Sequence, residues 1–135
     1  MIFTAIKPGL SATIHRTVTE ERTVGNHLPD DMEKLFSTPA LVSLMIEASV
    51  QAVDPHLPDG FLSVGKACEV YHDHPSVIGA TLQLVATITE CDDYHIKLAI
   101  RASDESGPVA HGTHVRTIAN KRWLQLKIGR RMAQM

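Results

Sequence analysis

The chain has 135 residues, of which 44% are hydrophobic and 21% are charged, and these values predict one globular domain spanning residues 1–135. The formal charge is −2 without a basic stripe, which disfavours nucleic acid as a ligand. The apolar stretches are shorter than the ~20 residues that a bilayer needs, and the first residues lack a signal-peptide pattern. Two cysteines, Cys68 and Cys91, are too few for a disulfide framework. We expect them to be small buried thiols of a cytoplasmic protein without a membrane span.

The first half of the chain predicts one strand and one long helix. Residues 12–24 alternate loosely and are rich in Thr and Val, which favours a strand. The helix begins at Thr38-Pro39, where a hydroxyl that can cap free amides precedes a proline suited to the first turn. It ends at Asp54-Pro55. Because its apolar side chains lie nearly all round, we expect the helix to be buried.

After Gly60 the period changes to two, which predicts strands over residues 62–71, 81–88, 94–101 and 109–119. Short connections leave no room for crossover helices, so the sheet should be antiparallel and should curve around the single helix. This is an α+β roll, whose open sheet edges favour pairing in a symmetric dimer. Beyond the last strand we expect a solvated tail. Alternation in the first of these strands places the following residues on one face: Leu62, Val64, Lys66, Cys68 and Val70.

Three segments resemble the fluoroacetyl-coenzyme A thioesterase family of small hotdog-fold proteins. They are residues 36–45 (FSTPALVSLM), 65–72 (GKACEVYH) and 112–116 (GTHVR), and the agreement extends from about residue 13 to residue 122. The resemblance implies a hotdog fold, with a curved antiparallel sheet wrapped around one central helix. It also implies hydrolysis of a small or medium acyl-CoA thioester. Hotdog domains also include non-catalytic acyl-thioester binding modules and hydratases, and these are the alternative functions.

The resemblance assigns roles to individual residues. Thr38 falls on the family's active-site threonine, His72 on its catalytic histidine, and Gly65 on the glycine whose backbone amide lies near the substrate carbonyl. The sequence departs from the family at the helix glutamate. Ile46 occupies that position and the acid follows at Glu47, about 100° further around the helix. Glu47 is therefore a candidate supporting carboxylate, with a structural hydrogen bond as its alternative role.

Thioester hydrolysis needs a nucleophile, a base and donors for the oxyanion. The reference pKa of histidine, near 6.5, suits His72 to the base role. Thr38 could attack covalently, orient a water or simply cap the helix. Asp73 could orient His72 or a water. His114 and Arg116 share a strand face with Gly112, which lines either the substrate channel or a polar outer surface.

The remaining expectations concern ligands and partners. His72 and His74 lie on one side of a strand, but Pro75 ends that strand at once, so we expect no metal and no cofactor. The predicted partners are the acyl-CoA substrate and a second copy of the chain, in a homodimer or higher homo-oligomer with sites at the subunit interface. The family's fluoroacetate-specific enzyme has a lid phenylalanine where this chain has Met32, so fluoroacetate specificity is not expected.

Overall fold

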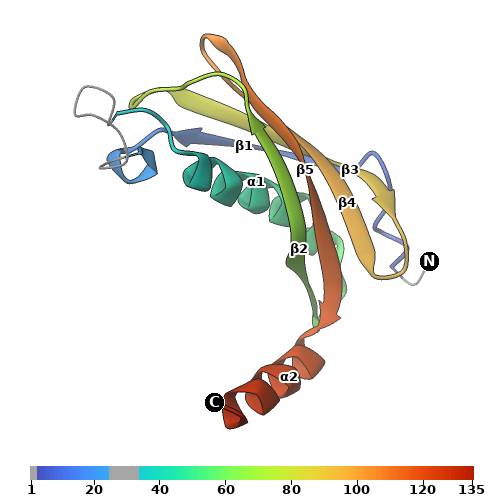
Figure 1. The fold of residues 1–135 in the computed structure, drawn as a ribbon. Coiled ribbons are helices and arrows are strands. Elements are labelled where there is room, and N and C mark those ends of the chain that lie inside the picture. The colour runs from blue at the N-terminus through green and yellow to red at the C-terminus, as the bar shows by residue number, and fades with distance from the viewer. Residues whose placement is uncertain (1–2, 25–33) are drawn as a thin grey trace.

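In the computed structural model, which describes residues 3–24 and 34–135, a five-stranded antiparallel sheet curves around one long helix (Figure 1). The strand order is β1-β3-β4-β5-β2, so β1 and β2 are the edges. The α+β architecture predicted from the sequence is confirmed. The elements of this body are β1 (Ser11–Thr17), α1 (Thr38–Val53), β2 (Phe61–His72), β3 (Thr81–Cys91), β4 (His95–Asp104) and β5 (Gly107–Asn120).

The first strand is shorter than the sequence predicted. β1 ends at Thr17, and the chain then makes a single 3₁₀ turn, Glu20–Arg22. The hydroxyl of Thr23 donates to the carbonyl of Glu20, and the guanidinium of Arg22 donates to that of Thr17. Local hydrogen bonding of this kind competes with a strand ladder, which explains why the Thr-rich stretch turns.

Helix α1 packs one side against the sheet and leaves the other partly uncovered. Val42, Ile46 and Val50, on the side away from the sheet, are only half-buried. The expectation of a wholly buried helix is therefore wrong for the isolated chain, because one sheet covers one side of a helix. The buried residues of α1 are Leu41, Leu44, Met45, Ala48, Ser49, Ala52 and Val53.

Strand β2 contains a bulge that the alternation pattern did not predict. Gly65 lies opposite Arg116 of β5, but Ala67 lies opposite Val115, so Lys66 is the extra residue. Directly paired residues of antiparallel strands point to the same face of a sheet. The bulge consequently puts Gly65 on the inner face, which also carries His72. In a regular strand, two residues seven positions apart would point to opposite faces.

Both cysteines are less buried than expected. Cys68 is exposed because β2 is an edge strand, with nothing in the described parts of the chain beyond it. Cys91, at the end of β3, is half-buried. Both thiols are free.

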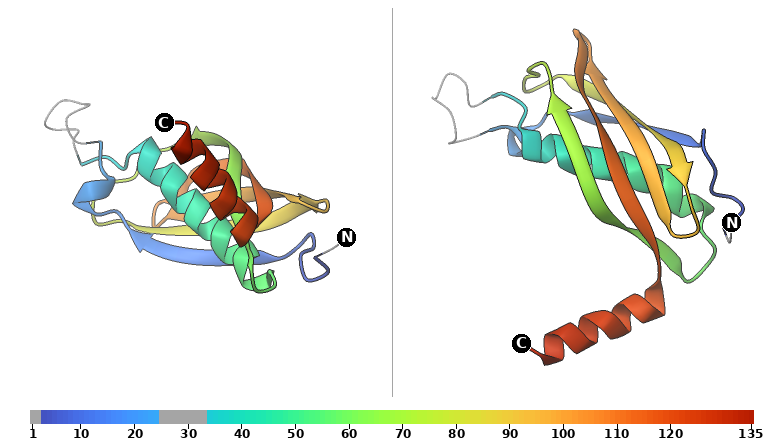
Figure 2. Two further views of the ribbon diagram at one scale, coloured as in Figure 1. Left: turned by 90° about the horizontal axis from the view of Figure 1, so that it is seen from below. Right: turned by 45° about the vertical axis from the view of Figure 1, so that its right-hand side comes forward.

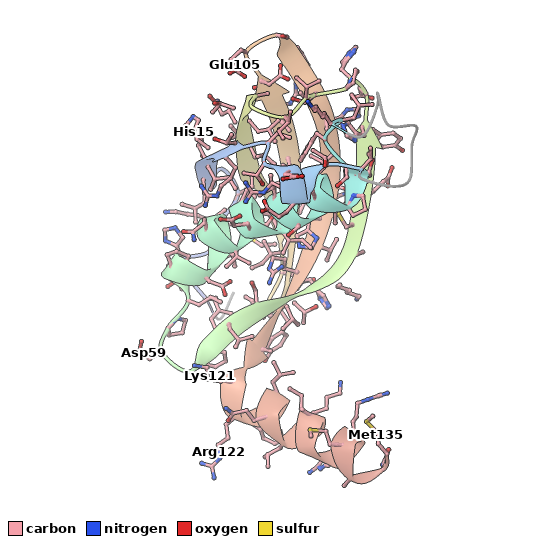
Figure 3. The ribbon with its side chains drawn as sticks, turned by 90° about the vertical axis from the view of Figure 1, so that its left-hand side faces the viewer. His15, Asp59, Glu105, Lys121, Arg122 and Met135 are labelled. Atoms are coloured by element: carbon pink, nitrogen blue, oxygen red, sulfur yellow. The ribbon has the colours of Figure 1, made fainter. Side chains whose placement is uncertain are left out.

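The C-terminal segment forms a helix, α2 (Lys121–Ala133), where we expected a tail. The side chain of Asn120 caps it by accepting from the backbone amides of Arg122 and Trp123, at 3.0 and 3.2 Å. The right-hand view of Figure 2 shows α2 projecting from the end of β5, away from the body, and none of its residues is buried. Arg122, in the first turn of α2, and Met135, just beyond its end, point into open space (Figure 3). In the described residues, no helix combines the length and apolar character that a membrane crossing needs.

Candidate active site

The start of α1 is capped by Ser37 and not by Thr38. The Ser37 hydroxyl accepts a hydrogen bond from the backbone amide of Ala40 at 3.2 Å, and its carbonyl accepts from that of Leu41 at 3.0 Å. Pro39 has no amide to offer. The expectation that Thr38 could serve as the N-cap is therefore wrong, because the capping position lies one residue earlier.

The threonine hydroxyl instead meets the histidine predicted to be its base. Thr38 Oγ1 and His72 Nδ1 lie 2.9 Å apart, which is a normal hydrogen-bond distance. Thr38 is the first residue of α1, and His72 is the last residue of β2. A hydroxyl hydrogen-bonded to an imidazole is the geometric signature of an activated nucleophile.

The surroundings of His72 keep its imidazole uncharged. The ring of Phe36 stands nearly edge-on to it, with centroids 5.7 Å apart. Burial lowers the pKa of His72 below its usual value, and the negative charge of Asp73 offsets this only in part. The Nε2 atom is buried without a hydrogen-bond partner among the described residues. A neutral ring that carries its proton on Nε2 leaves Nδ1 free to accept the Thr38 proton.

Asp73 does not hydrogen-bond His72. Its Oδ2 lies 2.7 Å from His111 Nδ1, and the His111 ring stacks on Tyr71, with centroids 5.0 Å apart and planes 13° apart. Adjacent strand residues point to opposite faces, so Asp73 is directed away from the ring that we expected it to orient. Its influence on His72 is electrostatic.

Glu47 lies away from the Thr38–His72 pair. Its Oε1 accepts from Arg16 of β1, both from Nε at 3.1 Å and from Nη2. At 1.5 Å per residue, nine residues place Glu47 about 14 Å along α1 from Thr38. Both side chains of the ion pair are about one-third exposed. This arrangement matches the structural alternative for Glu47 and not the catalytic one.

Gly65 is exposed on the edge strand, at the bulge. A side chain at this position would meet the ring of His114, since a Cβ built on Gly65 would lie 3.3 Å from His114 Cε1. Gly65 precedes His72 by seven residues, one of them bulged, so about 20 Å separates them along β2 at ~3.3 Å per residue. Within one chain the two residues cannot meet the same thioester carbonyl.

His114 and Arg116 lie on the inner face of β5, 2% and 4% exposed. Arg116 donates from Nε to Ser63 Oγ at 2.6 Å and from Nη2 to the Ser63 carbonyl at 2.7 Å. Ser63 Oγ in turn donates to Asp54. The two residues share a face, as predicted, but in the isolated chain they line neither a substrate channel nor a polar outer surface.

A large surface hollow of the described residues lies apart from the Thr38–His72 pair. It has a volume of about 790 Å³ and is lined by residues of β3, β4 and β5 together with Asp73, and neither Thr38 nor His72 contributes to it. No three His, Cys, Asp or Glu side chains of residues 3–24 and 34–135 come together as metal ligands. The Met32 position lies outside the described residues.

Three residues that hydrogen-bond the start of α1 or the predicted site residues Glu47 and Arg116 were not found from the sequence: Ser37, Ser63 and Arg16. Ser37 had a usable signal: a serine directly before Thr38-Pro39 can be the N-cap, because a helix tolerates proline at its second position as well as at its first. Ser63 and Arg16 had no signal, since their partners come from elements far apart in the chain.

Comparison with known proteins covers the segment that contains Thr38, Gly65 and His72. The family model for the fluoroacetyl-CoA-specific thioesterase matches residues 18–122. The fluoroacetyl-CoA thioesterase of Streptantibioticus cattleyicolor is 27% identical over 116 residues, which cover 82% of this chain and 84% of that protein.

Two solved structures are similar over most of the chain. The crystal structure of a hot-dog-like protein from Thermanaerovibrio acidaminovorans has a TM-score of 0.89 and 29% identity, and covers 97% of each chain. A mutant of the fluoroacetyl-CoA-specific thioesterase in complex with fluoroacetate and CoA has a TM-score of 0.78 and 26% identity. That match covers 88% of this chain and 99% of the other.

Proposed function

Since the chain belongs to the fluoroacetyl-CoA-specific thioesterase family, we propose that it hydrolyses small or medium acyl-CoA thioesters at a site built around Thr38 and His72. The observation that carries this proposal is the 2.9 Å contact between the Thr38 hydroxyl and His72 Nδ1. It pairs a nucleophile with a base at the end of β2, at the two positions to which the resemblance assigns the family's threonine and histidine.

The proposed reaction has two steps. As Thr38 Oγ1 attacks the thioester carbonyl, His72 Nδ1 takes its proton, and the carbon–sulfur bond breaks as that proton passes to the departing CoA sulfur. The resulting acyl ester on Thr38 is attacked by water, whose proton again goes to His72 and then to the threonine oxygen. The products are free CoA, a carboxylic acid and the regenerated hydroxyl.

His72 supports this chemistry because its burial favours the uncharged form of the ring. Its lowered pKa, which results from burial, keeps Nδ1 available as a proton acceptor. The oxyanion needs donors as well, and the first turn of α1 offers few, because Ser37 takes the amides of Ala40 and Leu41. We assign the donor role to the Gly65 amide.

A second copy of the chain supplies that amide. The ~20 Å between Gly65 and His72 along β2 excludes a shared site within one chain. Two copies that pair along β2 in antiparallel fashion bring Gly65 of each copy to the His72 of the other. The 12-residue free edge of β2 favours such pairing, and a second copy would also cover the half-buried Val42 and Ile46 of α1.

The bulge fixes the register of this pairing. With Lys66 bulged out of each strand, Glu69 of one copy lies opposite Glu69 of the other, and Val70 lies opposite Cys68. The same register puts His72 opposite Gly65, and all directly opposed residues then point to the same face. Without the bulge, Gly65 and His72 would lie on opposite faces of β2.

The two free thiols fit a cytoplasmic location, where cysteines stay reduced. We therefore place the dimer and its acyl-CoA substrate in the cytoplasm.

A substrate panel tests the proposal. Acyl-CoA thioesters of increasing chain length are incubated with the protein, and free CoA thiol is measured. We expect saturable release with at least one short or medium acyl chain, and a loss of ~10²-fold or more for Thr38→Val, which removes the hydroxyl and keeps the shape. Release no faster than the uncatalysed background across the whole panel would contradict the proposed function.

A further inference from the structure

A chain of polar side chains, of which Asp54 is half-buried and the others are buried, joins the end of α1 to the edge strand. It consists of Asp54, Ser63, Arg116 and His114, which we call the β2 clamp. Asp54 accepts from the Ser63 hydroxyl and Arg116 donates twice to Ser63, while His114 Nε2 lies 3.0 Å from Arg116 Nη1. The hydrogen bonds of these side chains do not include Thr38 or His72. Burying an arginine and a histidine costs free energy unless both are hydrogen-bonded. The hydrogen bonds of the clamp are therefore what allows these two side chains to be buried.

The partners of His114 define its protonation. A guanidinium has only donors and a carbonyl oxygen only accepts. Arg116 must therefore donate to Nε2, and His114 must carry its proton on Nδ1, which lies 2.8 Å from the carbonyl oxygen of Ala67. Burial and the positive charge of Arg116 both lower the pKa of His114. Only a neutral imidazole satisfies both neighbours.

Arg116 and His114 of the clamp hold the bulge from either side. Arg116 bonds the backbone carbonyl of Ser63, two residues before Gly65. His114 bonds the backbone carbonyl of Ala67, two residues after it. The His114 ring also packs against Gly65, where even a Cβ would lie 3.3 Å from Cε1. Bulged segments lack a regular ladder, so these side-chain bonds replace the missing backbone pairing.

We propose that His114, anchored by Arg116, is a positioning residue that holds the β2 bulge in the conformation that directs the Gly65 amide toward the substrate carbonyl bound in the partner subunit. This inference rests on the proposed function. It gives His114, a buried residue that touches neither the substrate nor the nucleophile, a role in the hydrolytic reaction. If the clamp is released, β2 can lose the bulge or shift it. Gly65 then leaves the inner face, although Thr38 and His72 stay in place.

The test compares two substitutions of His114. His114→Leu fills the site but removes both hydrogen bonds, and we expect kcat to fall ~10²-fold, the usual loss for an absent oxyanion donor. KM for the acyl-CoA should change by less than about threefold, because ground-state contacts remain. His114→Asn keeps an amide donor near the position of Nδ1, and it should retain kcat within about tenfold of the parent.

Ile100→Val is the matched control. It removes a buried methyl group from β4, which does not adjoin β2, and it should lower the melting temperature while leaving kcat within about twofold. A His114→Leu variant that keeps full kcat while folded, or His114→Asn falling as far as His114→Leu, would overturn the positioning role.

Amide hydrogen exchange of the full chain separates this inference from the proposed function. The amides of Gly65, Lys66 and Ala67 should exchange at least tenfold faster in His114→Leu than in Ile100→Val, relative to amides of β3, whereas exchange in His114→Asn should stay closer to that in Ile100→Val. If the parent hydrolyses no acyl-CoA, the proposed function fails, whereas the exchange result still decides whether the clamp holds the bulge. Unchanged exchange at all three amides would overturn the inference.

Discussion

Replacing His72 by alanine should remove most of the thioesterase activity without unfolding the protein. Loss of a general base typically lowers the rate ~10²–10⁴-fold, which corresponds to about 3–5 kcal/mol in the activation barrier. We expect the loss in kcat, measured by thiol release with the best acyl-CoA of the panel, to fall in this range.

The structure predicts only a small change in the free energy of unfolding for the same variant. His72→Ala removes the hydrogen bond to Thr38, worth about 1 kcal/mol, and the edge contact with Phe36, worth about 0.5–1.5 kcal/mol. It also removes the buried Nε2 atom that has no partner, which relieves a cost of about 1–3 kcal/mol. These contributions nearly cancel, so stability at pH 7 should change by no more than about 1 kcal/mol.

The pH dependence supplies the refuting result. Because burial lowers the pKa of His72, kcat/KM of the parent should rise with pH around a midpoint below 6.5, and that rise should be absent from the residual activity of His72→Ala. Stability should be lost as pH falls from 6.5 toward the lowered pKa, since the unfolded chain then binds more protons than the folded chain. A midpoint above 6.5, or a variant with the parent's kcat, would refute the assignment of His72 as the base.

Three further predictions concern the cap, the ion pair and the dimer. Ser37→Ala should cost about 1 kcal/mol of stability as a lost cap with activity within a few-fold, whereas Thr38→Ala should lower activity ~10²-fold or more; an unchanged thermal stability of Ser37→Ala would contradict the capping geometry. Glu47→Gln should cost at most about 1 kcal/mol, as partly exposed ion pairs do, and should leave kcat within about twofold, so a hundredfold loss would return Glu47 to the catalytic role. In a variant that lacks Cys91, an added Val70→Cys substitution should form a disulfide with Cys68 of the second copy after oxidation, which gives a covalent dimer on a non-reducing gel. The variant that lacks Cys91 but keeps Val70 should not form this dimer. A dimer in the control and none with Val70→Cys would exclude the proposed register.

Much of the fold could be predicted because the signals were local. The turn at Asp54-Pro55 and the period-two stretches after Gly60 predicted where α1 ends and where β2 to β5 lie. The family identified from three short segments is confirmed. The bulge at Lys66 could not be predicted, because the residues that hold it, His114 and Arg116, come from another strand and act only once β2 and β5 are paired.

The candidate site was predicted in part for the same reason. The meeting of Thr38 with His72 followed from the resemblance, and the structure brings the two side chains together. The ion pair of Glu47 could not be predicted, because its partner Arg16 lies 31 residues away on β1 and leaves no trace in the local pattern. Burial of a polar residue depends on which face of a strand it occupies, and one unpredicted bulge changes that face.

A double-mutant cycle on Thr38 and His72 tests the central claim most directly. The claim is that the hydroxyl and the imidazole act as one unit, the imidazole removing the proton as the hydroxyl attacks. Thr38→Val and His72→Ala should therefore each lower kcat/KM ~10²-fold or more. The kcat/KM of the double variant should lie within about threefold of that of the less active single variant. Losses that multiply in the double variant would show that the two groups act independently, and would contradict the account.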